Sequence, residues 1–99
     1  MINKTKIVAT LGPASNTRAV IQKMIAAGMN VARLNFSHGN YETHAESIKL
    51  IRSLSRTMNR QVGILLDLQG PKIRTGKLKD GGPVYLETGK KIRITTQDV

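Results

Sequence analysis

The sequence predicts a parallel α/β fold followed by a β-rich segment. Three short aliphatic runs, at residues 6–11, 30–36 and 62–68, alternate with two longer runs in which apolar residues recur every three or four positions. Strands that alternate with helices in this way lie parallel and are joined by right-handed crossovers. From residue 70 onward, apolar residues instead alternate with polar ones between turn residues. The chain therefore divides into two parts of different predicted architecture.

The first strand and helix are delimited by turn and capping residues. The strand at residues 6–11 ends at a Gly-Pro pair, and Ser15 or Asn16 supplies the side-chain oxygen that caps the following helix. The apolar residues of this helix share one face: Val20, Ile21, Met24 and Ile25. Gly28 ends the helix, because glycine takes the left-handed conformation that a C-terminal cap requires.

The same unit then repeats. A second strand covers residues 30–36, and the next helix starts at Gly39 and Asn40. Its apolar residues recur at steps of three and four: Ala45, Ile48, Ile51, Leu54 and Met58. The third strand covers residues 62–68 and leads directly into the β-rich segment.

Residues 70–99 predict antiparallel hairpins of a smaller domain. Turn residues at 80–83 and 88–89 separate short alternating runs. The strand-forming residues are Ile73, Thr75, Val84, Tyr85, Leu86, Ile92, Ile94 and Thr95. Three parallel strands neither close a barrel nor cover both of their own faces, and a (β/α)8 barrel takes about 250 residues. We therefore expect the chain to be a piece of a larger protein and to be poorly ordered by itself.

Composition narrows the classes of function. The 99 residues contain no cysteine, which excludes disulfides, thiolate metal sites and a cysteine nucleophile. No apolar run is long enough to cross a bilayer, and the first residues do not resemble a signal peptide, so a cytoplasmic setting is expected. The net charge of +10 favours anionic partners. It is spread evenly along the chain, which favours phosphorylated metabolites over nucleic acid.

Polar residues gather at the carboxyl ends of the predicted strands, where parallel α/β folds carry their chemistry. Because the strands are parallel, these residues meet at one rim. The residues at these strand ends, with the glycines and the proline of the adjoining turns, are Thr10, Gly12 and Pro13 after the first strand, Arg33, Asn35, Ser37, His38 and Gly39 at the second, and Asp67, Gln69, Lys72 and Arg74 at the third.

Arg33 and Asp67 each allow more than one interpretation. Arg33 either pairs with a carboxylate or meets a phosphate or carboxylate of a substrate, because a buried guanidinium requires an anion. Asp67 caps backbone amides, binds a cation or pairs with Arg33. His38 is a phosphate contact or a structural hydrogen-bonding residue rather than a general base. We expect His44, on the second helix, to be solvated.

Three segments resemble the pyruvate kinase family. Residues 4–15, KTKIVATLGPAS, are similar to its first strand and turn, and residues 28–39, GMNVARLNFSHG, to its second strand. Residues 66–76, LDLQGPKIRTG, resemble the segment that leaves the barrel for the lid domain. The resemblance implies an α/β fold: the first three strands and two helices of a (β/α)8 TIM barrel in residues 1–69, and the start of an inserted small β-barrel lid domain in residues 70–99.

The resemblance also implies an activity. This family transfers a phosphoryl group from phosphoenolpyruvate to ADP, giving pyruvate and ATP in glycolysis, with Mg²⁺. The family's catalytic lysine and magnesium ligands would lie beyond residue 99, so we expect the chain alone to be inactive. A homotetrameric, cytoplasmic parent enzyme that binds neither nucleic acid nor membrane is expected. The alternatives are a basic phosphate- or nucleic-acid-binding module and a barrel that senses phosphorylated metabolites without catalysis.

Site residues carried over by the resemblance fall into three groups. Arg33 contacts the transferring phosphoryl group. The nucleotide is bordered by Pro13, Asn35, Phe36, Ser37, His38 and Arg74. A monovalent-cation pocket is lined by Asn35, Ser37, Asp67 and the carbonyl of Leu68.

Departures from the family pattern occur near this pocket. Potassium-activated members have Thr, Lys and Glu where this chain has Leu68, Gln69 and Lys72. We therefore expect the ammonium of Lys72 to take the place of potassium. Thr43 stands where some members carry a tyrosine near the adenine.

Overall fold

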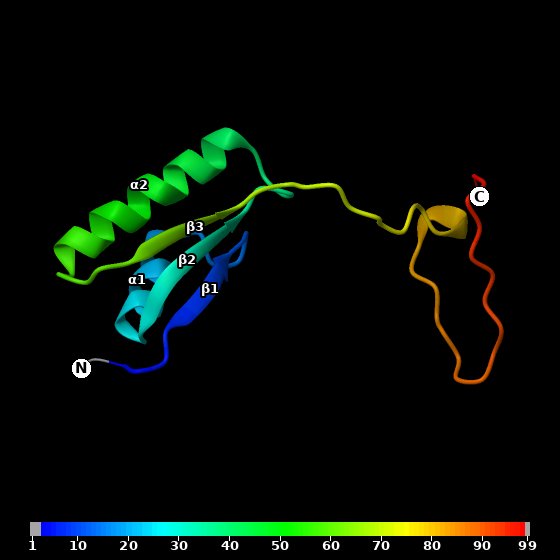
Figure 1. Ribbon diagram of the computed structural model, residues 1–99, viewed down its shortest axis with the longest axis horizontal. Helices are drawn as coiled ribbons and strands as arrows, with labels where there is room; N and C mark the ends of the chain where they lie inside the picture. The colour runs from blue at the N-terminus through cyan, green and yellow to red at the C-terminus, as the bar shows by residue number, and fades with distance from the viewer. Residues whose placement is uncertain (1–2, 99) are drawn as a thin grey trace.

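The computed structural model describes residues 3–98, which form a three-stranded sheet, two α-helices and a long C-terminal loop (Figure 1). The predicted ranges 1–69 and 70–99 include residues 1–2 and 99, which lie outside the described residues. The elements, in chain order, are β1 (Ile7–Leu11), α1 (Arg18–Ala26), β2 (Met29–Asn35), α2 (Tyr41–Thr57), β3 (Gly63–Asp67) and the 3₁₀ turn η1 (Lys79–Gly81).

The sheet has the order β1-β2-β3, with both neighbouring pairs parallel. The register places Thr10 opposite Arg33, and Asn35 opposite Asp67. The prediction of three parallel strands separated by two helices is therefore confirmed. Because the strands are parallel and in this register, their carboxyl ends lie together at one edge of the sheet.

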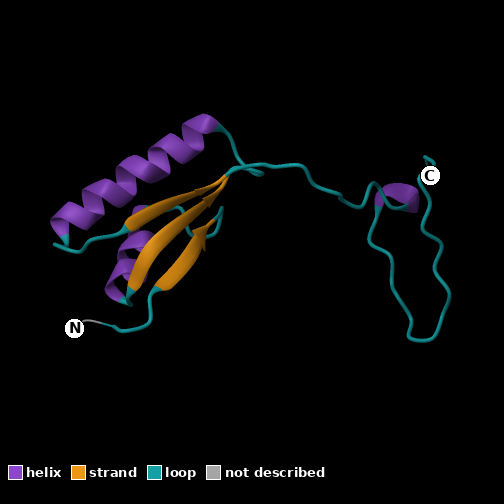
Figure 2. Cartoon of the chain, viewed as in Figure 1, coloured by secondary structure: helices purple, strands orange, loops and turns teal. Residues whose placement is uncertain are grey.

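Both helices cover the same face of the sheet (Figure 2). One core joins strand residues to residues of the two helices: Leu11, Ile21, Ile25, Met29, Ala32, Leu34, Ile51 and Leu54. Alternation along the strand turns Arg33 away from this core, because Ala32 and Leu34 on either side of it are buried. The opposite face of the sheet is uncovered, with Val8 and Leu65 exposed.

Both helices begin after a residue whose side chain caps the helix, but the N-cap of α1 differs from the predicted one. The N-cap of α1 is Thr17, whose Oγ1 accepts a hydrogen bond from the Val20 amide; the prediction of Ser15 or Asn16 was wrong. Ser15 instead closes the turn after β1, where its Oγ accepts a 2.9 Å hydrogen bond from the Gly12 amide. Asn40 caps α2 as predicted.

The C-terminal segment differs from its prediction. Residues 70–98 contain the 3₁₀ turn η1 but no strand, so the expected antiparallel hairpins are absent from this structure. An isolated hairpin gains little stability unless its apolar face packs on something, and here Tyr85 is 90% and Ile94 is 89% exposed. The radius of gyration of 18.8 Å exceeds the roughly 13 Å of a compact domain of this length, because this segment extends away from the sheet (Figure 1).

Candidate functional site

The guanidinium of Arg33 joins all three strands at the carboxyl edge of the sheet. Its Nε donates a 3.0 Å hydrogen bond to Oδ2 of Asp67 on β3, and its Nη2 forms an ion pair with the same oxygen. Its Nη1 donates a 3.0 Å hydrogen bond to Oγ1 of Thr10 on β1. The side chains of Arg33 and Asp67 are 31% and 45% exposed. Of the interpretations left open, pairing of Arg33 with Asp67 is the one observed.

This pairing still leaves Arg33 able to bind an anion. A guanidinium has five N–H donors, and the hydrogen bonds within residues 3–98 use three of them. The group lies on the uncovered face of the sheet, so an anion can approach it from solvent. Asp67 and Thr10 hold the planar group in one orientation, which favours recognition of a phosphate or carboxylate through two parallel hydrogen bonds.

The loop between β2 and α2, residues 36–40, lies beside this pair. The Phe36 amide donates a 3.0 Å hydrogen bond to the backbone oxygen of Asp67, which ties the loop to β3. The Ser37 amide donates a 3.0 Å hydrogen bond to Oδ1 of Asn35, and the His38 amide donates to the Asn35 backbone oxygen over 3.2 Å. These bonds join Ser37 and His38 to Asn35, and the strand register places Asn35 opposite Asp67.

His44 takes part in this loop, contrary to the prediction that it is solvated. Its ring stacks on Phe36 with centroids 4.3 Å apart, and its Nε2 lies 2.7 Å from the backbone oxygen of His38. His38 itself is exposed, and its backbone oxygen rather than its ring makes the contact. The sequence gives little indication that His44 contacts the loop, because only the folded loop brings Phe36 under the first turn of the helix.

The remaining candidates lie on the turn after β1 and in the loop after β3. Pro13 is exposed, in a turn closed by a 2.9 Å hydrogen bond from the Ser15 amide to the Gly12 oxygen. Leu68, Lys72 and Arg74 are all exposed, and among residues 3–98 the ion-pair partner of Asp67 is Arg33. Within residues 3–98 the structure thus brings Arg33, Asn35 and the backbone of Phe36 to Asp67, and Ser37 to Asn35, but it does not bring Lys72 into an ion pair with Asp67.

Side chains that commonly bind metal ions do not form a cluster in the described residues. Within residues 3–98, no three acidic or histidine side chains cluster closely enough to hold a metal ion. Asp67 is the one carboxylate at the strand ends, and Arg33 already neutralises it. By itself this part of the chain would supply one carboxylate to a magnesium ion, so the other ligands would be water, substrate phosphates or residues outside it.

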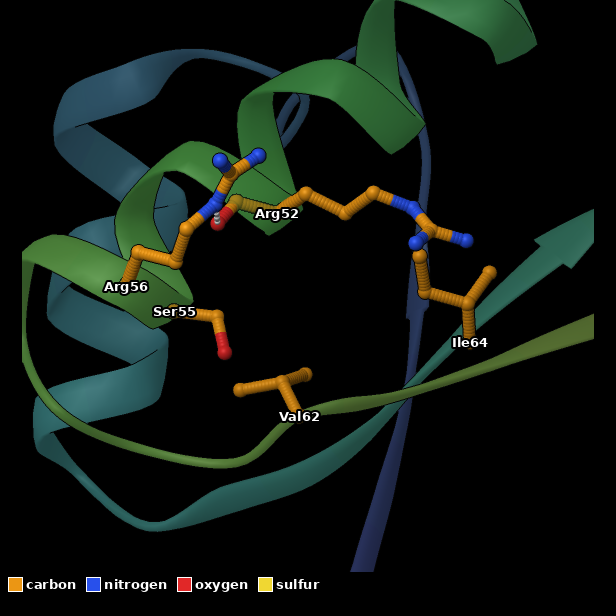
Figure 3. Close-up of a pocket in the computed structure, with 5 residues that line it drawn as sticks. All are labelled: Arg52, Ser55, Arg56, Val62 and Ile64. Carbon is orange, nitrogen blue, oxygen red and sulfur yellow. Dashed lines mark hydrogen bonds between the residues drawn. The ribbon is translucent and has the colours of Figure 1, made fainter.

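A shallow hollow of about 430 Å³ lies near the other end of the sheet (Figure 3). It is lined by Arg52, Ser55, Arg56, Val62 and Ile64, from the second half of α2 and the start of β3. Nε of Arg56 donates a 3.4 Å hydrogen bond to the Arg52 backbone oxygen at its margin. Because β3 runs from this hollow toward Asp67, the hollow is separate from the Arg33 site.

Across residues 3–98, no helix combines the length and the apolar character that crossing a membrane would need. The fold and the site together define the class: a parallel α/β protein whose polar site lies at the carboxyl ends of its strands. Comparison with protein families agrees, because residues 2–99 match the model of the pyruvate kinase barrel domain. The chain belongs to the pyruvate kinase family.

Individual relatives give the same result. The chain is 48% identical to a pyruvate kinase of Staphylococcus epidermidis over 98 residues, covering 99% of this chain and 17% of that one. It is 52% identical to a pyruvate kinase of Thermococcus litoralis over 97 residues, covering 98% of this chain and 20% of the relative. The chain therefore spans a fifth or less of the length of these relatives.

A solved structure shares the fold. A pyruvate kinase from Cryptosporidium parvum superposes with a TM-score of 0.68 at 46% identity, covering 76% of this chain and 15% of that one. The α/β arrangement of three parallel strands and two helices is consistent with the start of a (β/α)8 barrel.

Proposed function

We propose that this chain works as part of a longer polypeptide that transfers a phosphoryl group from phosphoenolpyruvate to ADP, giving pyruvate and ATP. The observation that carries the proposal is the guanidinium of Arg33, which is fixed by Asp67 and Thr10 and has N–H donors to spare at the strand ends. Membership of the pyruvate kinase family supports the choice of substrates.

Arg33 binds the transferring phosphoryl group in this proposal. Phosphoryl transfer needs positioning and neutralisation of charge more than covalent chemistry. A guanidinium already held in place loses little freedom when the anion arrives, so its interaction stabilises the transition state without further reorganisation. Asp67 and Thr10 act through Arg33, and neither of them needs to touch the substrate.

The proposed binding sites for the nucleotide and for the cation lie next to Arg33. We propose that the nucleotide is bordered by Pro13, Asn35, Phe36, Ser37, His38 and Arg74. Oxygen atoms of Asn35, Ser37, Asp67 and the Leu68 backbone form the monovalent-cation pocket, which suits a hard cation. We propose that the loop carrying Lys72 moves toward Asp67, so that the ammonium group of Lys72 takes the place of potassium. The magnesium ligands and the catalytic lysine are proposed to lie outside this chain.

The same proposal divides the chain into parts of a larger enzyme. Residues 1–69 form the first portion of the catalytic (β/α)8 barrel, and residues 70–99 begin the β-rich lid domain. The uncovered sheet face and the exposed apolar side chains of residues 70–98 support this division, because both need further elements to bury them. The complete enzyme is proposed to be a cytoplasmic homotetramer, and the 99-residue chain alone to be inactive.

The test is pyruvate formation by the full-length protein from phosphoenolpyruvate, ADP and Mg²⁺, with and without potassium. Activity in both conditions supports the phosphotransferase and the role of Lys72. Activity only with potassium keeps the phosphotransferase and rejects the role of Lys72. Absence of activity in both conditions, together with binding of phosphoenolpyruvate, would instead indicate a sensor without catalysis.

A further inference from the structure

The imidazole of His44 lies against the loop that joins β2 to α2, residues 36–40, and contacts it at two points. The ring stacks on Phe36, with centroids 4.3 Å apart and planes inclined by 16°. Nε2 lies 2.7 Å from the backbone oxygen of His38. Since a carbonyl oxygen only accepts hydrogen bonds, Nε2 carries a proton and donates it. A single side chain from the first turns of α2 thus holds both the start and the middle of the loop.

The loop is shaped to receive this ring. Gly39 has a φ of +73°, and a Cβ at this position would stand 3.2 Å from Nε2 of His44. A side chain here would therefore meet both backbone strain and the ring. Close approach of the Gly39 backbone to His44 is what allows the His38 oxygen to reach Nε2.

The same loop is tied to the Arg33 site. Phe36, which carries the stacked ring, donates its amide hydrogen to the backbone oxygen of Asp67 over 3.0 Å. Asp67 in turn pairs with Arg33. His44 is therefore linked through Phe36 to the residues at the strand ends. Its ring forms its hydrogen bond with His38 and none with Arg33 or Asp67 within residues 3–98.

We propose that His44 is a positioning residue that holds the loop of residues 36–40 in the conformation that receives the nucleoside diphosphate. It acts through Phe36 and His38, by stacking on one and donating a hydrogen bond to the backbone of the other. The nucleotide part of this inference rests on the proposed function, whereas the effect on the loop does not.

Hydrogen exchange in the full-length protein tests the effect on the loop. The amides of residues 36–38 all donate hydrogen bonds in the structure, so their exchange reports opening of the loop. We expect His44→Ala to speed their exchange about tenfold, because one hydrogen bond and one ring contact are lost. His44→Gln keeps a donor without the ring and His44→Phe keeps the ring without the donor, so each should show a smaller increase. Glu46→Gln, at an exposed position of the same helix, is the control.

Two exchange results would overturn the inference. Unchanged exchange at residues 36–38 in His44→Ala would mean that the ring does not hold the loop. Faster exchange that extends equally over residues 48–54 would mean that His44 stabilises α2 as a whole and has no particular effect on the loop.

Steady-state kinetics test the nucleotide part. His44→Ala should raise KM for ADP about tenfold, while kcat and KM for phosphoenolpyruvate change little, and His44→Gln should recover part of the loss. An unchanged KM for ADP would reject the nucleotide role even if exchange increased. A wild-type protein without kinase activity would reject the proposed function, while the exchange measurements would still decide whether His44 holds the loop.

Discussion

Arg33 and Asp67 form an ion pair across two neighbouring parallel strands, with Nε and Nη2 of the arginine both donating to Oδ2 of the aspartate. The two residues are 34 positions apart in the sequence. The register of β2 and β3 places Asn35, two residues beyond Arg33, directly opposite Asp67. Both side chains are partly exposed, so the stability that the pair contributes is small, about 1 kcal/mol or less. Its consequence is orientation of the guanidinium toward the uncovered face of the sheet.

Arg33→Lys in the full-length protein should lower kcat/KM for phosphoenolpyruvate by about 100-fold, the usual effect of removing a positioned donor from a transition state. Lysine keeps the charge but cannot donate to Asp67, Thr10 and a phosphoryl group from one planar group. Pyruvate formation is the measurement, and Arg52→Lys, near the opposite end of the sheet, is the control. A loss in Arg33→Lys no larger than in the control would rule out the assigned role.

Asp67→Asn should lower kcat/KM by about tenfold, because the amide holds Arg33 less firmly than a charged oxygen does. When two residues act as a unit, substituting both lowers activity by less than the product of the two single losses. The double variant Arg33→Lys/Asp67→Asn should therefore be little worse than Arg33→Lys alone. The exposed pair of Lys90 and Glu87 provides a matched control, since Glu87→Gln should leave activity unchanged. Losses that multiply fully in the double variant would contradict positioning of Arg33 by Asp67.

Lys72→Glu should make pyruvate formation depend on potassium, because the tethered ammonium is replaced by a carboxylate that needs a cation beside it. Activity is measured in sodium and in potassium salts at equal ionic strength. Lys77→Glu, in the same exposed loop, controls for the change in net charge. The same response to potassium in both variants would reject substitution of potassium by Lys72.

Gly39→Ala should destabilise the protein by about 1–2 kcal/mol, the cost of a left-handed conformation for a residue with a Cβ. The added methyl group also comes within 3.2 Å of His44 Nε2. The midpoint of thermal unfolding of the full-length protein is the measurement. Gly12→Ala is the control, because a Cβ there meets nothing within 4 Å. Equal midpoints in the two variants would show that the loop accepts a side chain at residue 39.

The 99-residue chain alone should form no pyruvate from phosphoenolpyruvate, ADP and Mg²⁺. Residues 3–98 hold no cluster of acidic or histidine side chains for a metal ion, and one face of the sheet is uncovered. We also expect narrow dispersion in its amide NMR spectrum. Wide dispersion with a cooperative melt would contradict the expected disorder, and measurable turnover would contradict the expected inactivity.

The sequence by itself determined the strands, the helices and most of the face that each helix buries. In α2 the prediction was incomplete, because Ala45 is exposed and Ser47 is buried. Aliphatic runs predicted the strands, helical spacing predicted the helices, and Gly28 marked the end of the first helix. These signals are readable because local geometry and hydrophobic periodicity depend on residues near one another in the chain. It also determined the rim on which Arg33, Asn35 and Asp67 meet, because the carboxyl ends of parallel strands share one edge. The structure shows no strand in residues 70–98, where the alternation predicts hairpins, since pattern alone does not supply a surface to pack against.

Only the tertiary structure decided which side chains pair at that rim. Whether Arg33 meets a carboxylate depends on the register between β2 and β3, and the same register brings Thr10 of β1 to the guanidinium. The position of His44 depends on the path of the loop before α2, which carries Phe36 under the ring and the His38 oxygen to Nε2. These contacts depend on the path of the folded backbone, which the spacing of residues in the sequence does not reveal. They form only when the strands and helices pack together.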